Sequence, residues 1–243
     1  MPALLSGVLL GASFLNASWG WLACGAFVPL LALLERQAGE ARPRWTAFRT
    51  GYLFGFVFFL VGTHWIARLS NVAITVPWLK YPAWIAASAY LAIYPALACA
   101  LAVGLVRRSG FSLAVTFPAA MLMVEVLRAS GELGFPWFQP GYAVHGFPRI
   151  IQLASLGGVT LLTAWMLLVN VLLWRALPLG APAGFGPSRR LAAAGLLAAL
   201  VLPWAWGGKA LQAADAMAAR STAAHGTIAL IQGNIPGEIK WSG

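Results

Sequence analysis

The sequence predicts an all-α polytopic membrane bundle of about seven transmembrane helices, followed by the first β-strand of an α/β domain. The first observation is composition, because 60% of the 243 residues are hydrophobic and only 9% are charged. Soluble domains carry about 25% charged residues, so a chain this apolar cannot cover a water-facing surface. The second observation is a change of character at His225, where the apolar segments give way to a short strand-like stretch.

Seven segments are predicted as membrane spans, since a helix needs about 20 apolar residues, within a range of about 17–25, to cross a bilayer. The first two are short, and only the Asn-Ala-Ser at residues 16–18 separates them. We therefore expect this pair to form a tight hairpin or to be partly inserted. The seven predicted spans are residues 3–18, 19–34, 50–68, 82–106, 111–127, 150–174 and 191–207.

Basic residues are distributed unevenly over the loops between these spans. Cytoplasmic loops are enriched in Lys and Arg, so the N-terminus is predicted to be cytoplasmic and the C-terminal tail, in a bacterium, periplasmic. The net charge of +10 forms no continuous patch, so no nucleic-acid partner is expected. The loops after the second, fourth and sixth spans hold Arg36, Arg42, Arg44, Arg49, Arg107, Arg108, Arg175, Arg189 and Arg190, whereas the alternate loops hold Arg68, Lys80, Arg128 and Arg149.

The chain divides into three predicted parts. Residues 1–207 form the transmembrane helical domain, and residues 208–225, which are rich in Ala, form a helical linker. From residue 226 the sequence predicts a β-strand, Thr-Ile-Ala-Leu-Ile, that runs into a Gly-Asn-Ile-Pro turn. We expect residues 226–243 to be the start of a soluble α/β domain that is truncated here.

Glu125 is the only acidic residue inside a predicted span, near the outer end of the fifth. A charge at the centre of a span costs about 2.5–3.5 kcal/mol on insertion scales, and less near the interface. Arg128 lies three residues further on, so the two side chains share a helix face and can pair. The pair is either a structural ion pair that anchors the fold or part of a substrate-binding mouth, which makes both residues substrate-binding candidates.

Residues 134–142 cannot form a regular helix, because two prolines and two glycines interrupt the stretch Gly-Phe-Pro-Trp-Phe-Gln-Pro-Gly-Tyr. Trp137 and Tyr142 fall at the predicted outer interface, where such side chains commonly anchor a protein. One interpretation is an interfacial aromatic belt. The other is a shaped re-entrant or lid-like segment facing an outer-leaflet substrate, with Trp137 and Tyr142 as substrate-binding candidates.

No group of residues with catalytic or metal-binding spacing stands out in the sequence. Cys24 and Cys99 lie in apolar segments without a C-x-x-C or metal-type spacing, and His64 and His145 are single histidines. No G-x-S-x-G or Walker-type loop occurs. We therefore expect no metal, no cofactor and no catalytic residue within this chain.

Four regions in this order carry a resemblance to a known family. The chain resembles the apolipoprotein N-acyltransferases, bacterial inner-membrane enzymes with a transmembrane bundle and a periplasmic nitrilase-like (carbon–nitrogen hydrolase) domain. The resemblance spans nearly the whole chain but only about the N-terminal half of the family's length. The four regions are residues 51–56 with 64–66, residues 89–97, residues 125–128 with 134–137 and 141–142, and residues 228–236 with 240–241.

The resemblance implies acyl transfer from a phospholipid to the N-terminal diacylglyceryl-cysteine of an apolipoprotein. In the family a nitrilase-type Glu-Lys-Cys triad carries the reaction, with Cys taking the acyl chain as a thioester. The triad lies beyond the first nitrilase strand, so this chain alone is expected to be inactive. Trp241 matches a tryptophan near the family's active-site cleft, and is either a substrate-binding residue or an aromatic that packs the new domain. The implied partners are the phospholipid acyl donor, the diacylated apolipoprotein and membrane lipid, with the protein expected to be a monomer.

Two other classes of protein compete with this interpretation. A small-solute transporter would favour charged residues deep within several spans or paired broken helices, and Glu125 alone does not meet that expectation. A non-catalytic membrane scaffold would end in a tail that docks a separate soluble subunit. A single β-strand with unpaired edges argues against such a tail.

Overall fold

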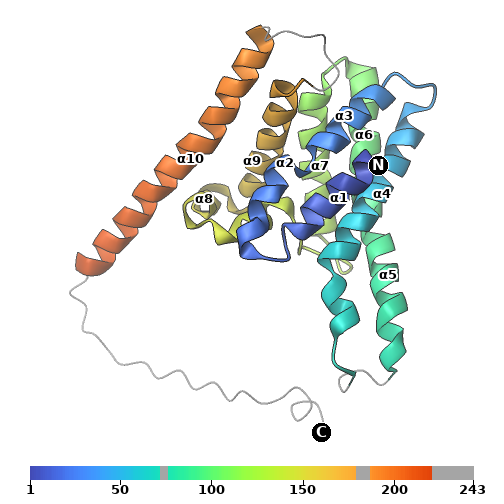
Figure 1. Ribbon diagram of the computed structural model, residues 1–243, viewed down its shortest axis with the longest axis horizontal. Helices are drawn as coiled ribbons and strands as arrows, with labels where there is room; N and C mark the ends of the chain where they lie inside the picture. The colour runs from blue at the N-terminus through green and yellow to red at the C-terminus, as the bar shows by residue number, and fades with distance from the viewer. Residues whose placement is uncertain (72–75, 179–186, 221–243) are drawn as a thin grey trace.

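The computed structural model describes residues 1–71, 76–178 and 187–220, and every regular element within them is a helix (Figure 1). This confirms the all-α class. The predicted β-strand, its turn and Trp241 lie outside the described residues. The helices are α1 (Pro2–Ala12), η1 (Ala17–Leu22), α2 (Ala23–Ala26), α3 (Val28–Gln37), α4 (Pro43–Gly62), η2 (His64–Arg68), η4 (Pro77–Leu79), α5 (Lys80–Leu91), α6 (Ile93–Ser109), α7 (Leu113–Arg128), η5 (Pro140–Gly146), α8 (Pro148–Ile151), α9 (Ala154–Ala176) and α10 (Pro187–Arg220).

Five helical stretches of the described chain are long and apolar enough to cross a membrane, so the predicted number of seven is not confirmed. The first predicted span is the eleven-residue α1, which is about 16 Å long and too short for a hydrocarbon core of about 30 Å. The fifth is α7, whose 16 residues reach about 24 Å. The five stretches are Ala17–Gln37, Pro43–Arg68, Pro77–Ser109, Ala154–Ala176 and Pro187–Ala219.

The core of the bundle depends on glycines where helices cross. A Cβ on Gly51 would lie 2.7 Å from the carbonyl oxygen of Pro95, and one on Gly55 would lie 2.3 Å from the Pro95 ring. Gly7 of α1 meets the backbone of α4 in the same way. Small residues let membrane helices approach closely, because packing rather than the hydrophobic effect drives their association in lipid. α1 and α6 can therefore flank α4 with their backbones in near contact.

Asn170 of α9 closes the break between α2 and α3. Its side-chain oxygen accepts a hydrogen bond from the backbone N–H of Phe27 at 2.8 Å. Its amide donates to the carbonyl oxygens of Ala23 at 2.8 Å and of Met166 at 2.9 Å. Because no water can satisfy backbone groups in the membrane interior, a buried amide at this position allows the second predicted span to be interrupted without loss of hydrogen bonds.

The two ends of the bundle differ in charge. The starts of α4, α7 and α10 and the ends of α3, α6 and α9 lie together at one end, which we call the basic end (Figure 1). The nine arginines of the predicted cytoplasmic loops belong to these termini and the segments between them. The opposite end carries η2, α8 and the loop at residues 129–139. α10, whose 34 residues measure about 51 Å, runs from the basic end along α9 and α8 toward the opposite end.

The predicted boundary at residue 207 falls inside α10, which continues without interruption to Arg220. The first part of the predicted linker, residues 208–220, is thus the end of this same helix. Its remainder, and all of the predicted soluble segment, lie outside the described residues.

Candidate functional site

A buried ion pair occupies the last turn of α7. The Arg128 Nη2 lies 2.5 Å from Glu125 Oε2, and the exposed fractions of the two side chains are 0% and 8%. A second hydrogen bond joins Arg128 Nε to Glu125 Oε1 at 3.4 Å. Burying two charges is costly unless they are paired and their remaining donors are satisfied. The question for function is therefore where the other donors of Arg128 go.

Arg128 holds the 129–139 loop by its backbone. Its Nη1 donates to the carbonyl oxygens of Phe135 and of Trp137, the latter at 2.7 Å. The backbone N–H of Phe135 donates back to the carbonyl oxygen of Arg128 at 2.7 Å. The guanidinium also lies over the Phe59 ring of α4, 5.5 Å from its centroid. Glu125 thus neutralises the group that shapes the loop, and both residues lie behind it.

Phe138 anchors this loop in the bundle. Its φ of +62° is in the left-handed region, which residues other than Gly rarely adopt and which costs about 1–3 kcal/mol. The Phe138 ring packs against Phe14 at 5.1 Å and Phe58 at 6.4 Å between centroids. A Cβ on Gly62 would lie only 3.0 Å from this ring. The absence of a side chain at Gly62 makes room for the aromatic packing that offsets the strained backbone.

The aromatic side chains around this anchor line a hollow at the opposite end of the bundle from the basic end. Its volume is about 380 Å³, and we call it the aromatic hollow. Trp65, Trp137 and Tyr142 remain 42%, 59% and 44% exposed, so they form its open side. Sites of about 300–1,000 Å³ with apolar walls are the usual size for a ligand. The lining residues are Phe14, Trp65, Trp137, Phe138 and Tyr142.

A second hollow of about 360 Å³ lies next to the first along the chain. Leu15 and His64 line this second hollow, and their neighbours Phe14 and Trp65 line the aromatic hollow. Arg68 contributes a positive charge to its wall. The two hollows together therefore offer apolar surface with a cation beside it.

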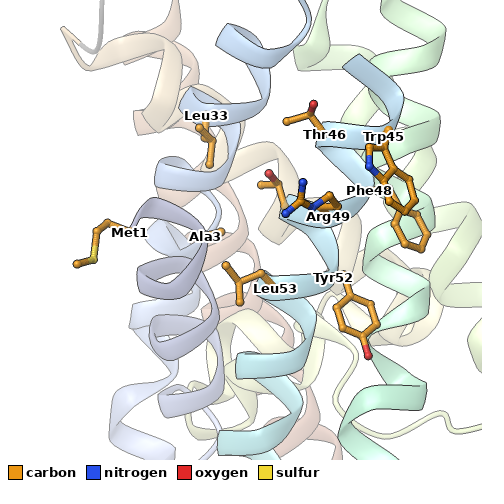
Figure 2. Close-up of a pocket in the computed structure, with 10 residues that line it drawn as sticks. Met1, Ala3, Leu33, Trp45, Thr46, Phe48, Arg49, Tyr52 and Leu53 are labelled. Atoms are coloured by element: carbon orange, nitrogen blue, oxygen red, sulfur yellow. The ribbon is translucent and has the colours of Figure 1, made fainter. Parts of the chain in front are cut away.

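A larger hollow lies elsewhere. Its volume is about 620 Å³, and it lies between the start of α1 and the first turns of α4 (Figure 2). Trp45, Arg49 and Tyr52 of α4 line it together with Met1 and Leu33. It contains none of the residues that the sequence singled out for substrate binding. We therefore place the candidate site in the aromatic hollow, despite its smaller size.

The structure brings together two of the predicted substrate-binding residues and separates two others from them. Trp137 and Tyr142 line the aromatic hollow. Glu125 and Arg128 lie behind the loop and act on the hollow through the backbone of Trp137. Trp241 lies outside the described residues. Phe138 was not singled out in the sequence, although it stands in the same segment, because its role depends on a backbone conformation and on a partner glycine.

The residues that line the aromatic hollow supply binding surface rather than reactive groups. None of the five is a thiol, a carboxylate or an amine. Cys99 is fully buried in the core, where its Sγ faces Gly51, and Cys24 lines a separate crevice. No group of three or more potential metal ligands occurs among the described residues. This arrangement offers apolar surface against which a hydrocarbon chain can pack.

Comparison with known proteins identifies the family. A family model described as the apolipoprotein N-acyltransferase N-terminal domain matches residues 6–172, which include the whole aromatic hollow. A Geobacter metallireducens protein named apolipoprotein N-acyltransferase is 34% identical over 245 residues, covering 99% of this chain and 44% of its own length. A Chromobacterium violaceum protein of the same name is 32% identical over 243 residues, covering 100% of this chain and 44% of its own length.

A third relative of that name, from Ralstonia nicotianae, is 38% identical over 162 residues, covering 65% of this chain and 30% of its own length. The chain thus spans less than half the length of these relatives. The matched part contains the ion pair, the loop and the hollow, so these features belong to the shared region. The resemblance drawn from the sequence is confirmed, and the chain belongs to the apolipoprotein N-acyltransferase family.

Proposed function

We propose that this chain is the membrane part of an enzyme that transfers a fatty acyl chain from a phospholipid to the N-terminal diacylglyceryl-cysteine of lipoproteins. The name carried by its relatives supports this reaction class. We place the protein in the bacterial inner membrane. The catalytic Glu, Lys and Cys belong to a nitrilase-like domain that begins near residue 226, so the chain alone is inactive.

The observation that carries the proposal is the aromatic loop fixed by Arg128. A loop at membrane depth is tolerated where protein covers its polar backbone, and here Arg128 satisfies the carbonyls of Phe135 and Trp137. By holding the loop in place, this buried network keeps Trp137 and Phe138 in the wall of the exposed, apolar hollow. We assign to it the acyl chain of the donor phospholipid or of the diacylated acceptor, with Arg68 in the neighbouring hollow positioned for a phosphate.

The charge pattern and α10 support the proposed topology. Basic loops favour the cytoplasm, so the basic end is cytoplasmic and the aromatic hollow opens on the periplasmic side. α10 begins at the basic end and extends past α8, so its C-terminal end lies on the same side of the bundle as the hollow (Figure 1). A membrane-bound lipid and a periplasmic thiol nucleophile would then meet at one surface.

In the reaction we propose, the Cys thiolate attacks the ester carbonyl of the phospholipid, and the lysophospholipid leaves as an alcohol after taking up a proton. The α-amino group of the lipoprotein cysteine then attacks the thioester, forms an amide and releases the thiol. Glu serves as general base in both steps and Lys stabilises the oxyanion. The hollow contributes by positioning acyl chains, which lowers the entropic cost of bringing the two substrates together.

The transporter alternative receives no support from Glu125. A solute or proton pathway would need this carboxylate to be available, whereas both of its oxygens are engaged by Arg128. Glu125, the one acidic residue within the predicted spans, is neutralised by Arg128 of the same helix.

The test uses the full-length protein encoded by the complete gene, reconstituted with labelled phospholipid and a diacylated lipopeptide. Trp137→Ala should lower the rate of acyl transfer by about 10-fold or more, the loss of about 1.4 kcal/mol of transition-state stabilisation. Trp45→Ala is the matched control, because Trp45 has the same exposed fraction, 59%, at the basic end. Equal rates for both variants and the wild type would overturn the assignment of the hollow.

A further inference from the structure

A separate apolar crevice divides α10 from the rest of the bundle. Its volume is about 410 Å³, and its walls are almost wholly apolar. Leu200, Trp204 and Ala205 line it from α10, and Cys24, Val144 and Trp165 line it from the other side. η5 forms the partition between this crevice and the aromatic hollow, since Val144 faces the crevice and Tyr142 the hollow.

Close contacts above and below keep the crevice open. Toward the basic end, the Trp165 Nε1 donates a hydrogen bond to the carbonyl oxygen of Ala199 at 2.7 Å, and Gly195 meets Leu172 of α9. Toward the opposite end, a Cβ on Gly207 would lie 1.8 Å from the carbonyl oxygen of Arg149. α10 therefore touches α9 and α8 at two levels. The space between these levels is bounded by the Trp165 side chain at one end and by the backbone contact at Gly207 at the other.

Arg149 stands at the end of the crevice away from the basic end. Its guanidinium lies 5.0 Å from the centroid of the Trp204 ring, and the residue is exposed. Trp204 follows Arg189 by 15 residues of helix, about 22 Å, so it lies well toward the far side of a core of about 30 Å. Among the described residues no acidic side chain pairs with Arg149, since the one ion pair there joins Glu125 and Arg128. A guanidinium in this setting is suited to a phosphate, which it can bind with two parallel hydrogen bonds.

We propose that this crevice is a binding site for one membrane phospholipid, with an acyl chain between α9 and α10 and the phosphate on Arg149. The apolar walls suit a hydrocarbon chain, and Arg149 at the end of the crevice suits a phosphate. A phospholipid carries these two groups in the same order, with the phosphate nearer the membrane surface. The small volume favours an extended chain over a protein helix, which is about 10–12 Å across with its side chains. The bound lipid would fill the space under α10 and hold this helix to the bundle.

This proposal goes beyond acyl transfer and does not depend on it. Lipid occupancy of the crevice can be measured on this chain without any catalytic domain. Conversely, if Trp137→Ala had no effect on acyl transfer, the proposal for the crevice would still stand, because Trp137 is not part of the crevice wall.

The first experiment is native mass spectrometry of the purified chain released from detergent micelles. Ala205→Leu places a larger side chain in the crevice wall and so fills part of the space, and Arg149→Gln removes the proposed partner of the phosphate. Each should lower the fraction of protein that carries one phospholipid by about 5-fold or more. The controls are Ala198→Leu, on an exposed position of α10 outside the crevice wall, and Lys80→Gln, which removes one charge on α5. Both controls should retain lipid like the wild type.

A second experiment locates the lipid with a phospholipid that carries a photoreactive diazirine on one acyl chain. Cross-links should map to the peptide that contains Cys24 and to residues 200–205, and the Cys24 cross-link should fall at least 5-fold in Ala205→Leu. Labelling of the exposed Leu191 serves as the reference for bulk lipid. Unchanged lipid retention in both crevice variants, or an unchanged Cys24 cross-link, would overturn the proposal. A variant that unfolds is recognised by its melting temperature, and Arg149→Gln, on an exposed side chain, keeps the test decisive.

Discussion

The Arg128 Nη1 donates a hydrogen bond to the carbonyl oxygen of Trp137 at 2.7 Å, so a fully buried arginine on α7 positions a tryptophan that stays 59% exposed. The charge of Arg128 is neutralised by Glu125, three residues before it on the same helix. The exposed aromatic surface of the hollow therefore depends on a polar network that is itself buried. This division between a buried support and an exposed surface leads to separate predictions for stability and for activity.

Replacing one member of the buried pair should be more harmful than replacing both. Arg128→Met leaves Glu125 buried without a partner and should lower the free energy of unfolding by about 3–5 kcal/mol. The double variant Glu125→Leu with Arg128→Met removes both charges and should recover most of that stability, measured as the melting temperature in detergent. Its acyl-transfer rate in the full-length protein should stay low, because the carbonyls of Phe135 and Trp137 remain untethered. A double variant with both stability and activity restored would contradict the positioning role.

Gly62→Ala should disturb the aromatic hollow. The new Cβ would lie 3.0 Å from the Phe138 ring, so Phe138 must shift, at a cost of about 1–3 kcal/mol for overpacking. The expected results are a lower melting temperature and a slower acyl transfer by the full-length protein. Gly25→Ala is the matched control, since its nearest neighbour would be the Leu173 side chain at an ordinary 3.7 Å. If the two variants behave alike, Phe138 does not need the space at Gly62.

Asn170→Leu should destabilise the bundle without altering the hollow. The substitution leaves the N–H of Phe27 and the carbonyl of Ala23 buried without their partner, at about 1–3 kcal/mol for each group. We expect a clear drop in the melting temperature and a transfer rate per folded molecule close to that of the wild type. Gln152→Leu removes one exposed hydrogen bond to the carbonyl oxygen of Pro148 and should change stability by less than about 0.5 kcal/mol. A similar drop in both variants would show that Asn170 is not special.

The proposed topology predicts the side on which a fused reporter is active. Alkaline phosphatase, which needs an oxidising compartment, should be active when fused after Gly243 and inactive when fused after Ser109, at the basic end between α6 and α7. A fluorescent protein that matures only in the cytoplasm should give the reverse pattern. Phosphatase activity at Ser109 would invert the orientation and remove the argument that places the aromatic hollow on the periplasmic side.

Part of the site was predictable from the chain because it is local. Glu125 and Arg128 stand three residues apart on one helix, so their pairing follows from helix geometry and the cost of an unpaired charge in lipid. The prolines and glycines of residues 134–142 exclude a regular helix in the same local way. The partners of Arg128 in the loop, and the fit of Phe138 over Gly62, join residues on different elements. No spacing in the sequence indicates them.

The spans show the same limit. Apolar runs identified the membrane helices, but a run does not show where its helix ends. α1 stops at Ala12, although the predicted span continued to residue 18. The second run is broken between α2 and α3, and Asn170 of α9 satisfies the break from a distance of 143 residues in the chain. The composition of a segment shows how strongly it prefers lipid. The length of its helix depends also on which side chains from other helices can hydrogen-bond to its backbone.

The sequence by itself determined that this is a helical membrane protein, the sign of charge on its loops, and the motifs that carry its family resemblance. These properties are sums over local terms, the transfer of side chains to lipid and the preference of basic loops for one side. Only the tertiary structure decided which side chains meet, because packing is a property of surfaces brought together from distant parts of the chain. It turned Glu125 and Arg128 into the support of a loop, Trp137 and Tyr142 into the rim of a hollow, and Arg149 into the mouth of a separate crevice.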